Sequence, residues 1–112
     1  MAAPRILMCP PEHYGIEYEI NPWMNRHRQA DHALAVRQWE DLRGALESLR
    51  VDISLVEPVA GLPDLVFTAN AGMIYRDVAV LSRFRHPQRQ GEEPHFQRWF
   101  TANDFAVLTP PN

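Results

Sequence analysis

The spacing of apolar and polar residues in the first half of the chain predicts a strand, a helix and a second strand. Residues 5–8 form a short apolar run that a Cys-Pro-Pro sequence ends, which favours a strand. Apolar residues recur at helical spacing across 35–49 with charged residues on the other faces, and Asp31 is a suitable N-cap for this amphipathic helix. Residues 51–56 alternate as a strand, and 58–63 predict a turn.

The second half of the chain predicts three strands, a helix and a last strand. The apolar run at 65–68 predicts a buried strand. Residues 73–82 predict a hairpin that turns near the middle, and a polar loop with three arginines follows it. A proline and two glutamates predict the start of a helix that covers about 94–103, and 105–108 predict a strand.

This order of elements predicts an α/β fold for a single domain over 1–112. The elements group into two similar modules, approximately 4–57 and 62–109. The connection at 10–27 is long and rich in aromatic residues and turn formers, which is typical of a functional loop. We expect it to form a mobile lid or entrance loop that includes Tyr18 and Asn21; the alternative is an aromatic-packed surface loop.

Composition and charge exclude several classes of protein. The 112 residues are 46% hydrophobic with a net charge of -3, so no electrostatic argument favours a nucleic-acid partner. The single cysteine, Cys9, excludes an intrachain disulfide and a multi-cysteine metal site, and the histidines lack ligand spacing, so we expect no metal and no cofactor. The N-terminus lacks the apolar length of a signal peptide, and no stretch has membrane-spanning length, which predicts a soluble cytoplasmic protein without a membrane partner.

Candidate chemistry concentrates between 62 and 75. Asp64, Phe67 and Asn70 stand three residues apart in this otherwise apolar segment. Polar groups that border a core strand cost free energy unless they are paired or bind a ligand. A carboxylate, a ring and an amide together suit an interior hollow that holds a flat cation. The alternatives are a turn-forming role for Asp64, a core position for Phe67 and backbone capping by Asn70.

Three motifs in this order resemble the N-terminal part of the penteins, the superfamily of guanidine-modifying enzymes. They are MCPP at 8–11 followed by YEINPWM at 18–24, PDLVFTANAG at 63–72, and RQGE at 89–92. The resemblance runs from about residue 5 to 107. It is greatest to the branch that contains bacterial amidinotransferases, arginine dihydrolases and dimethylarginine dimethylaminohydrolases.

The resemblance implies a partial α/β propeller of about two ββαβ-type modules, because the family builds its site from five modules. It implies hydrolysis or amidino transfer at the guanidino group of arginine or a related compound, through a cysteine thiolate and a histidine that lie in later modules. We therefore expect no catalytic residue in this chain, a fragment that is inactive alone, and a structural role for the buried Cys9.

The resemblance also assigns roles to residues of the candidate site. Asp64 would bind the guanidinium and Phe67 would stack on it. Asn70 stands where several relatives carry an acid, which favours the dihydrolase-like branch over a deiminase. Arg89, and with weaker support Arg83, would hold the α-carboxylate of an arginine-like small molecule; the alternative for both is a solvated basic loop.

Two other classes of function stay open. A partial propeller leaves strand edges and apolar surface uncovered, which predicts a homo-oligomer and a non-catalytic binding or assembly module. An unrelated small α/β domain with accidental motif matches is the third interpretation.

Overall fold

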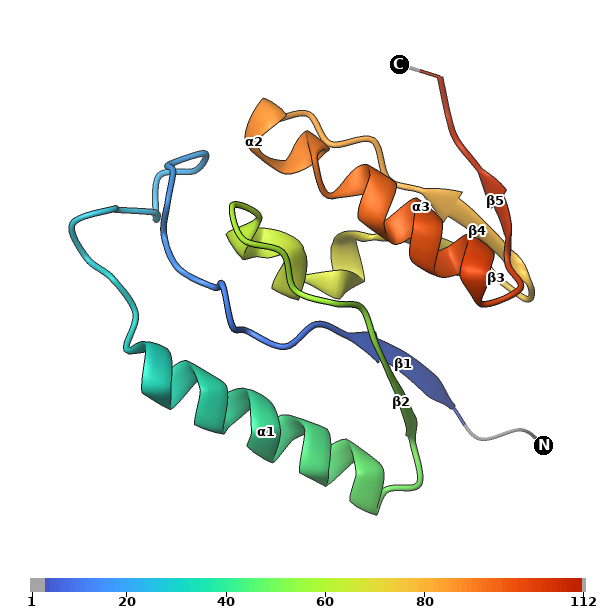
Figure 1. Ribbon diagram of the computed structural model, residues 1–112, viewed down its shortest axis with the longest axis horizontal. Coiled ribbons are helices and arrows are strands. Elements are labelled where there is room, and N and C mark those ends of the chain that lie inside the picture. Colours follow the sequence, from blue (N-terminus) through green and yellow to red (C-terminus); the bar gives the residue numbers. More distant parts are fainter. Residues whose placement is uncertain (1–3, 112) are drawn as a thin grey trace. The chain divides into compact units, whose positions relative to one another are not determined.

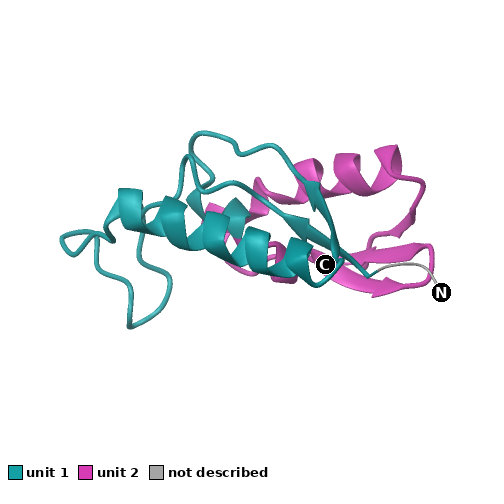
Figure 2. Cartoon of the chain, turned by 90° about the horizontal axis from the view of Figure 1, so that it is seen from below, with its two compact units in different colours: residues 1–66 teal, residues 67–112 magenta. Residues whose placement is uncertain are grey.

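The computed structural model describes residues 4–111, which divide into two compact units. Unit 1 is Met1–Val66 and unit 2 is Phe67–Asn112 (Figure 2). Each unit has its own sheet: one has two strands and the other has three. Both units combine strands with helices, so the predicted α/β class is confirmed.

Unit 1 consists of a parallel strand pair and one long helix (Figure 1). Strand β1 (Arg5–Met8) pairs in parallel with β2 (Asp52–Leu55), and α1 (His32–Ser48) connects them beside β2. The Asp31 carboxylate accepts a hydrogen bond from the Leu34 N–H at 3.1 Å, which satisfies one of the donors that a helix start leaves open. The predicted strands, helix and N-cap of this unit are confirmed.

The apolar face of α1 is only half-buried among the described residues: Ala35, Trp39 and Leu46 are partly covered. None of its 17 residues is buried. Leu42 is 54% exposed and the following Leu49 is 73% exposed. The helix therefore gains less from burial than a helix with fully buried residues, and its N-cap adds to its stability.

The prediction of a strand at 65–68 is wrong. Two short 3₁₀ helices lie there instead, η1 (Pro63–Val66) in unit 1 and η2 (Thr68–Asn70) in unit 2. Their N–H groups bond three residues back, from Leu65 to Leu62 at 3.2 Å and from Asn70 to Phe67 at 3.0 Å. Proline fixes the backbone of the first turn, and the consecutive buried residues Pro63, Asp64 and Leu65 do not show the period of two that a half-buried strand requires.

Unit 2 is a three-stranded sheet with helices between its strands. Strands β3 (Gly72–Tyr75) and β4 (Val78–Leu81) form the predicted antiparallel hairpin, and β5 (Ala106–Leu108) pairs in parallel with β4. The predicted polar loop contains a short helix, α2 (Pro87–Gln90), and the predicted last helix is α3 (Glu93–Ala102).

The core of unit 2 lies where α3 packs against β4 and β5 (Figure 1). Phe96 and Phe100 of α3 are buried, and so are Ala79 and Leu81 of β4. The ring of Phe105 contacts Phe100 edge-on, with the ring centroids 5.4 Å apart. Aromatic contacts of this kind add to the stabilisation that area burial provides.

Across 4–111, no helix has the length and the apolar character that crossing a membrane would require.

Candidate functional site

In unit 1, the candidate guanidinium-binding carboxylate is buried. Asp64 follows Pro63 in the first turn of η1 and is 6% exposed. The Tyr18 hydroxyl donates a hydrogen bond to its Oδ2 atom at 2.6 Å, across 46 positions of sequence. A buried carboxylate needs such donors because burial removes its hydration. The sequence predicted a polar pocket at Asp64 but did not predict that Tyr18 contacts it.

Side chains in and next to the entrance loop form hydrogen bonds with the backbone of the loop. The side-chain oxygen of Asn21 accepts the N–H groups of Trp23 at 3.0 Å and Met24 at 3.1 Å, which makes a local turn. Gln29 accepts from the Ile16 N–H at 3.0 Å and donates to the Ile16 carbonyl at 2.8 Å. Asn21 thus shapes the loop with its oxygen, and its predicted place at a substrate entrance stays a prediction.

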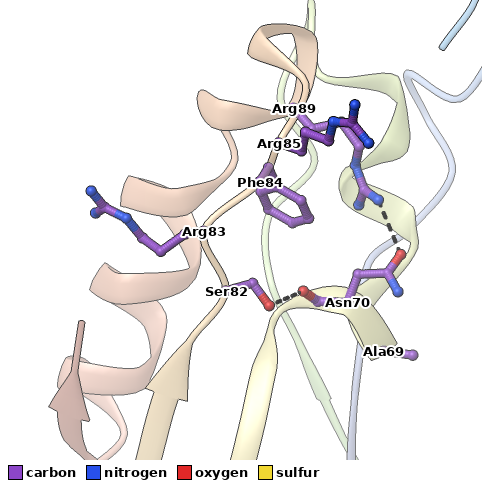
Figure 3. A pocket seen from close by; sticks show the side chains of 7 residues that line it. All are labelled: Ala69, Asn70, Ser82, Arg83, Phe84, Arg85 and Arg89. Carbon is purple, nitrogen blue, oxygen red and sulfur yellow. Dashed lines mark hydrogen bonds between the residues drawn. The ribbon is translucent and has the colours of Figure 1, made fainter. Parts of the chain in front are cut away.

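Unit 2 contains an open hollow of about 510 Å³ at the end of β4 (Figure 3). It brings together three of the predicted substrate-binding residues: Asn70, Arg83 and Arg89. The other lining residues are Ala69, Ser82, Phe84 and Arg85. Three arginines make the lining cationic and rich in hydrogen-bond donors, which suits an anionic group of a ligand.

The Arg89 guanidinium contacts the side chains of three other residues of unit 2. Its Nε and Nη2 atoms donate to the two oxygens of Glu92 at 2.8 and 2.9 Å, and Nη1 donates to the side-chain oxygen of Asn70 at 3.0 Å. The guanidinium carbon lies 4.4 Å from the centre of the Phe84 ring. Such a bidentate, stacked arginine is fixed in position before any ligand arrives.

Arg83 has different surroundings from Arg89. Its Nη1 atom lies 3.6 Å from Oε1 of Glu93, and Figure 3 shows its side chain directed away from Asn70 and Arg89. The other oxygen of Glu93 accepts the Phe84 N–H at 2.8 Å. Glu92 and Glu93, the two acids at the start of α3, thus pair with two different arginines of the hollow.

Two predicted residues lie outside this hollow. Phe67 is 46% exposed and does not line it, and Asp64 belongs to unit 1. Sequence reasoning missed Glu92 and Phe84 as parts of the site. The signal for Glu92 was its spacing of three from Arg89, which places two side chains of a helical turn together.

Across the described residues, 4–111, no three histidine, cysteine or acidic side chains gather in a way that could hold a metal ion. Cys9 is a buried cysteine whose thiol donates a hydrogen bond to the Pro10 carbonyl oxygen, with Sγ 3.6 Å from that oxygen. It packs at the end of β1 as a small core residue.

No model of a protein family matches the chain, but curated proteins do. The chain is 50% identical over 109 residues to the bifunctional arginine dihydrolase/ornithine cyclodeaminase ArgZ of Synechocystis sp., a match that covers 96% of this chain and 15% of that protein. It is 40% identical over 105 residues to the N(G),N(G)-dimethylarginine dimethylaminohydrolase of Mycobacterium tuberculosis, covering 94% of this chain and 35% of that protein. The chain thus spans a minor part of the length of these relatives.

A solved structure agrees with these matches. The crystal structure of a cysteine-to-alanine variant of AgrE in complex with L-arginine has a TM-score of 0.93 at 45% identity, and the match covers 100% of this chain and 17% of that one. The resemblance predicted from the motifs is confirmed: the chain is homologous to the N-terminal part of arginine-modifying enzymes of the pentein superfamily.

Proposed function

We propose that this chain supplies the N-terminal part of the substrate site of an enzyme that modifies the guanidino group of arginine or a related compound. The observation that carries the proposal is the buried Asp64 carboxylate, which the Tyr18 hydroxyl holds at 2.6 Å. A carboxylate in such a place offers planar acceptors to a guanidinium, and burial strengthens that interaction because water does not screen it.

The relatives and the residues together support the proposed reaction class. The reaction is hydrolysis or amidino transfer, in which a cysteine thiolate attacks the guanidinium carbon and water or an amine resolves the covalent intermediate. Cys9 is buried beside a proline and is unsuited to that attack. The nucleophile and the general base therefore belong to modules outside these 112 residues, and the chain alone is inactive.

The proposed architecture is a partial α/β propeller. Unit 2 has the order ββαβ with a short additional helix, and unit 1 has the order βαβ. Asp64 belongs to the first of these modules, and Asn70, Arg83 and Arg89 belong to the second. In this proposal Phe67 stacks on the guanidinium, Tyr18 and Asn21 border the entrance, and the enzyme is cytoplasmic.

Titration of L-arginine into the isotope-labelled chain, followed by NMR, tests the proposal. We expect arginine to shift the signals of Asp64 and Tyr18, and Asp64→Asn to weaken binding at least about tenfold, because a hydrogen bond to a charged group contributes about 1.5–3 kcal/mol. Asp52→Asn, an exposed position in the same unit, is the matched control and should leave binding unchanged.

Ornithine is the ligand control, because it has the same backbone groups as arginine but no guanidinium. Equal binding of ornithine and arginine, or an Asp64→Asn chain that binds arginine as the wild type does, contradicts the proposal. Incubation of the chain with arginine should yield no ornithine, citrulline or exchanged amidine, and any turnover contradicts the inactivity of the chain alone.

Exposed apolar surface supports a second candidate function, which is assembly into oligomers. Apolar side chains are exposed on the edge strand β3, where Met73 is 72% and Tyr75 is 68% exposed, and α1 presents Leu42 and Leu49. Exposed apolar surface beside an open strand edge favours association. We propose a homo-oligomer through these surfaces. Light scattering at micromolar concentration should give a mass above that of one chain, and a monomer there contradicts this.

A further inference from the structure

Gln29 closes the connection between β1 and α1, drawn from blue to cyan in Figure 1, into a loop. Its side-chain oxygen accepts the Ile16 N–H at 3.0 Å and its side-chain nitrogen donates to the Ile16 carbonyl at 2.8 Å, across 13 positions of sequence. The same nitrogen donates to the Arg26 carbonyl at 2.8 Å. A surface loop whose ends are held together in this way is compact. We call residues 16–29 the latched loop, with Gln29 as its latch.

The chemistry of the amide explains this closure. A glutamine has an acceptor oxygen and a donor nitrogen, so it can satisfy the N–H and the carbonyl of one residue at the same time. Paired residues of an antiparallel sheet exchange the same two bonds. The two contacts therefore restrain the backbone of Ile16 as a strand partner would. A glutamate could not replace them, because an ionised carboxylate accepts hydrogen bonds and donates none.

Tyr18 follows Ile16 by two residues and shares its side of the chain. Burial alternates along the start of the latched loop: residues 16, 18 and 20 are half-buried, whereas the glutamates at 17 and 19 are exposed. Alternation of this kind places residues two apart on one face. The Tyr18 hydroxyl donates to Oδ2 of the buried Asp64 at 2.6 Å. A restraint on the backbone of Ile16 thus also restrains the direction of the Tyr18 side chain.

Hydrogen bonds inside the latched loop join its two halves. The Arg26 N–H donates to the Glu19 carboxylate at 3.1 Å, and the Gln29 amide bonds to both Ile16 and Arg26. Tyr18 lies between Ile16 and Glu19, in the half of the loop that these bonds hold. The latch and the Tyr18–Asp64 contact therefore belong to one bonded unit, and the loss of either contact weakens the other.

We propose that Gln29 is a positioning residue that, by closing the latched loop at Ile16, holds the Tyr18 hydroxyl on the Asp64 carboxylate. This role rests on the proposed function, in which Asp64 binds the guanidinium. A hydrogen bond at Oδ2 restrains the rotation of the carboxylate, so the lone pairs that remain on its oxygens keep a defined direction for a planar cation. Gln29 thus supports recognition of the guanidinium without touching the ligand.

Reciprocal NMR measurements on the chain test the coupling between the latch and Tyr18. In the wild type we expect a slowly exchanging Tyr18 hydroxyl proton and a protected Ile16 N–H. Gln29→Ala should speed the exchange of the Tyr18 hydroxyl, and Tyr18→Phe should speed that of the Ile16 N–H by a similar factor of about three- to tenfold, because coupling between two contacts is reciprocal. A folded Gln29→Ala chain with unchanged Tyr18 exchange, or a Tyr18→Phe chain with unchanged Ile16 exchange, overturns the proposal.

Two further variants separate the latch from a general effect of mutation. Gln38→Ala is the matched control, because Gln38 is an exposed glutamine of α1 in the same unit, and it should leave both exchange rates unchanged. Gln29→Glu keeps the length of the side chain but turns an oxygen toward the carbonyls of Ile16 and Arg26, so it should behave as Gln29→Ala does. Slow Tyr18 exchange in Gln29→Glu, or its loss in Gln38→Ala, overturns the proposal.

The binding test compares L-arginine with ornithine, which lacks the guanidinium. Gln29→Ala should reduce the preference for arginine over ornithine by about three- to tenfold, because Asp64 is held less firmly, and Gln38→Ala should not. An unchanged or increased preference in Gln29→Ala overturns the positioning role. Failure of the wild type to bind either ligand contradicts the proposed function instead, and the exchange measurements then decide whether Gln29 holds Tyr18 on Asp64.

Discussion

The two units of the molecule hold their candidate site residues by different means. In unit 2, Glu92 lies at the start of α3, whose Phe96 and Phe100 are buried against the sheet, and it anchors Arg89 through two short bonds. In unit 1, Asp64 accepts a hydrogen bond from Tyr18, which lies in a long loop. A site residue supported by a packed helix is restrained by the core, whereas one supported by a loop is restrained by individual hydrogen bonds.

The helices show the same difference. The ten residues of α3 include two buried phenylalanines, and the 17 residues of α1 include no buried residue within the described chain. The length of a helix therefore does not measure how strongly it is fixed. The shorter α3 has fully buried side chains, while the longer α1 has only half-buried ones together with the Asp31 cap. We therefore expect truncation of a helix side chain to lower the free energy of unfolding much more in unit 2 than in unit 1.

The largest effect should come from Phe96→Ala. Phe96 is fully buried, and truncation of a buried phenylalanine costs about 3–5 kcal/mol through lost burial and a residual cavity. The matched change in unit 1, Leu42→Ala on α1, should alter the free energy of unfolding by less than about 0.5 kcal/mol when the protein is dilute enough to be monomeric, because Leu42 is exposed in the single chain. Urea unfolding followed by separate NMR signals of β4 and α1 measures both.

A cost for Leu42→Ala as large as that for Phe96→Ala would end the contrast between the helices. It would mean that the face of α1 is covered in solution, as the proposed homo-oligomer requires. Repeating the Leu42→Ala measurement over a range of protein concentration separates these cases, because only stabilisation through association depends on concentration.

Glycine-to-alanine changes should have effects of opposite sign on the stability of the two units. At Gly72 in β3 an added Cβ would collide with the carbonyl oxygen of Val80 on the paired strand, so Gly72→Ala should destabilise by about 1–3 kcal/mol. At Gly44 in α1 an added Cβ meets nothing within 4 Å, so Gly44→Ala should stabilise by about 0.5–1 kcal/mol. Thermal unfolding of the two variants tests the signs, and equal signs contradict this account.

Elements with strong local signals could be predicted from the sequence. The helix from His32 to Ser48 follows from its apolar period and the Asp31 cap, and the hairpin follows from two short apolar runs around Arg76 and Asp77. Residues 65–68 could not be assigned correctly from apolarity alone, because burial in a 3₁₀ turn and burial in a strand select the same residue types.

The sequence predicted several residues of the candidate site, but it did not predict the contacts between them. The motifs identified Asn70 and Arg89, and the hollow of unit 2 does bring them together. Glu92 was not predicted as the partner of Arg89, because it was assigned to the end of a helix. Tyr18 was not predicted as the partner of Asp64, because the two residues lie 46 positions apart in the sequence. Contacts of that kind depend on tertiary packing, which a local pattern does not report.

Tyr18→Phe should give an intermediate effect on unit 1. The change removes only the hydroxyl that donates to the buried Asp64 carboxylate, so we expect a loss of about 1–2 kcal/mol and a larger mobility of the entrance loop. Tyr75→Phe removes a hydroxyl from an exposed tyrosine of unit 2 and should be close to neutral. Chemical denaturation gives the stabilities. Equal effects of the two changes would show that the Asp64 contact does not stabilise the unit.

The smallest effect concerns the pH response of the entrance loop in unit 1. The backbone N–H of Arg26 donates to the Glu19 carboxylate at 3.1 Å, and this bond, more than the nearby Arg26 charge, lowers the pKa of Glu19 below its ordinary value of 4.5. A folded-state pKa below the unfolded one contributes stability above pH 4.5, and that contribution is lost as pH falls through the lowered value. The loop signals of Arg26 should therefore change below pH 4.5 in the wild type and not in Glu19→Gln. An NMR titration measures both; a Glu19→Gln chain with the same acid transition would assign the transition to another group.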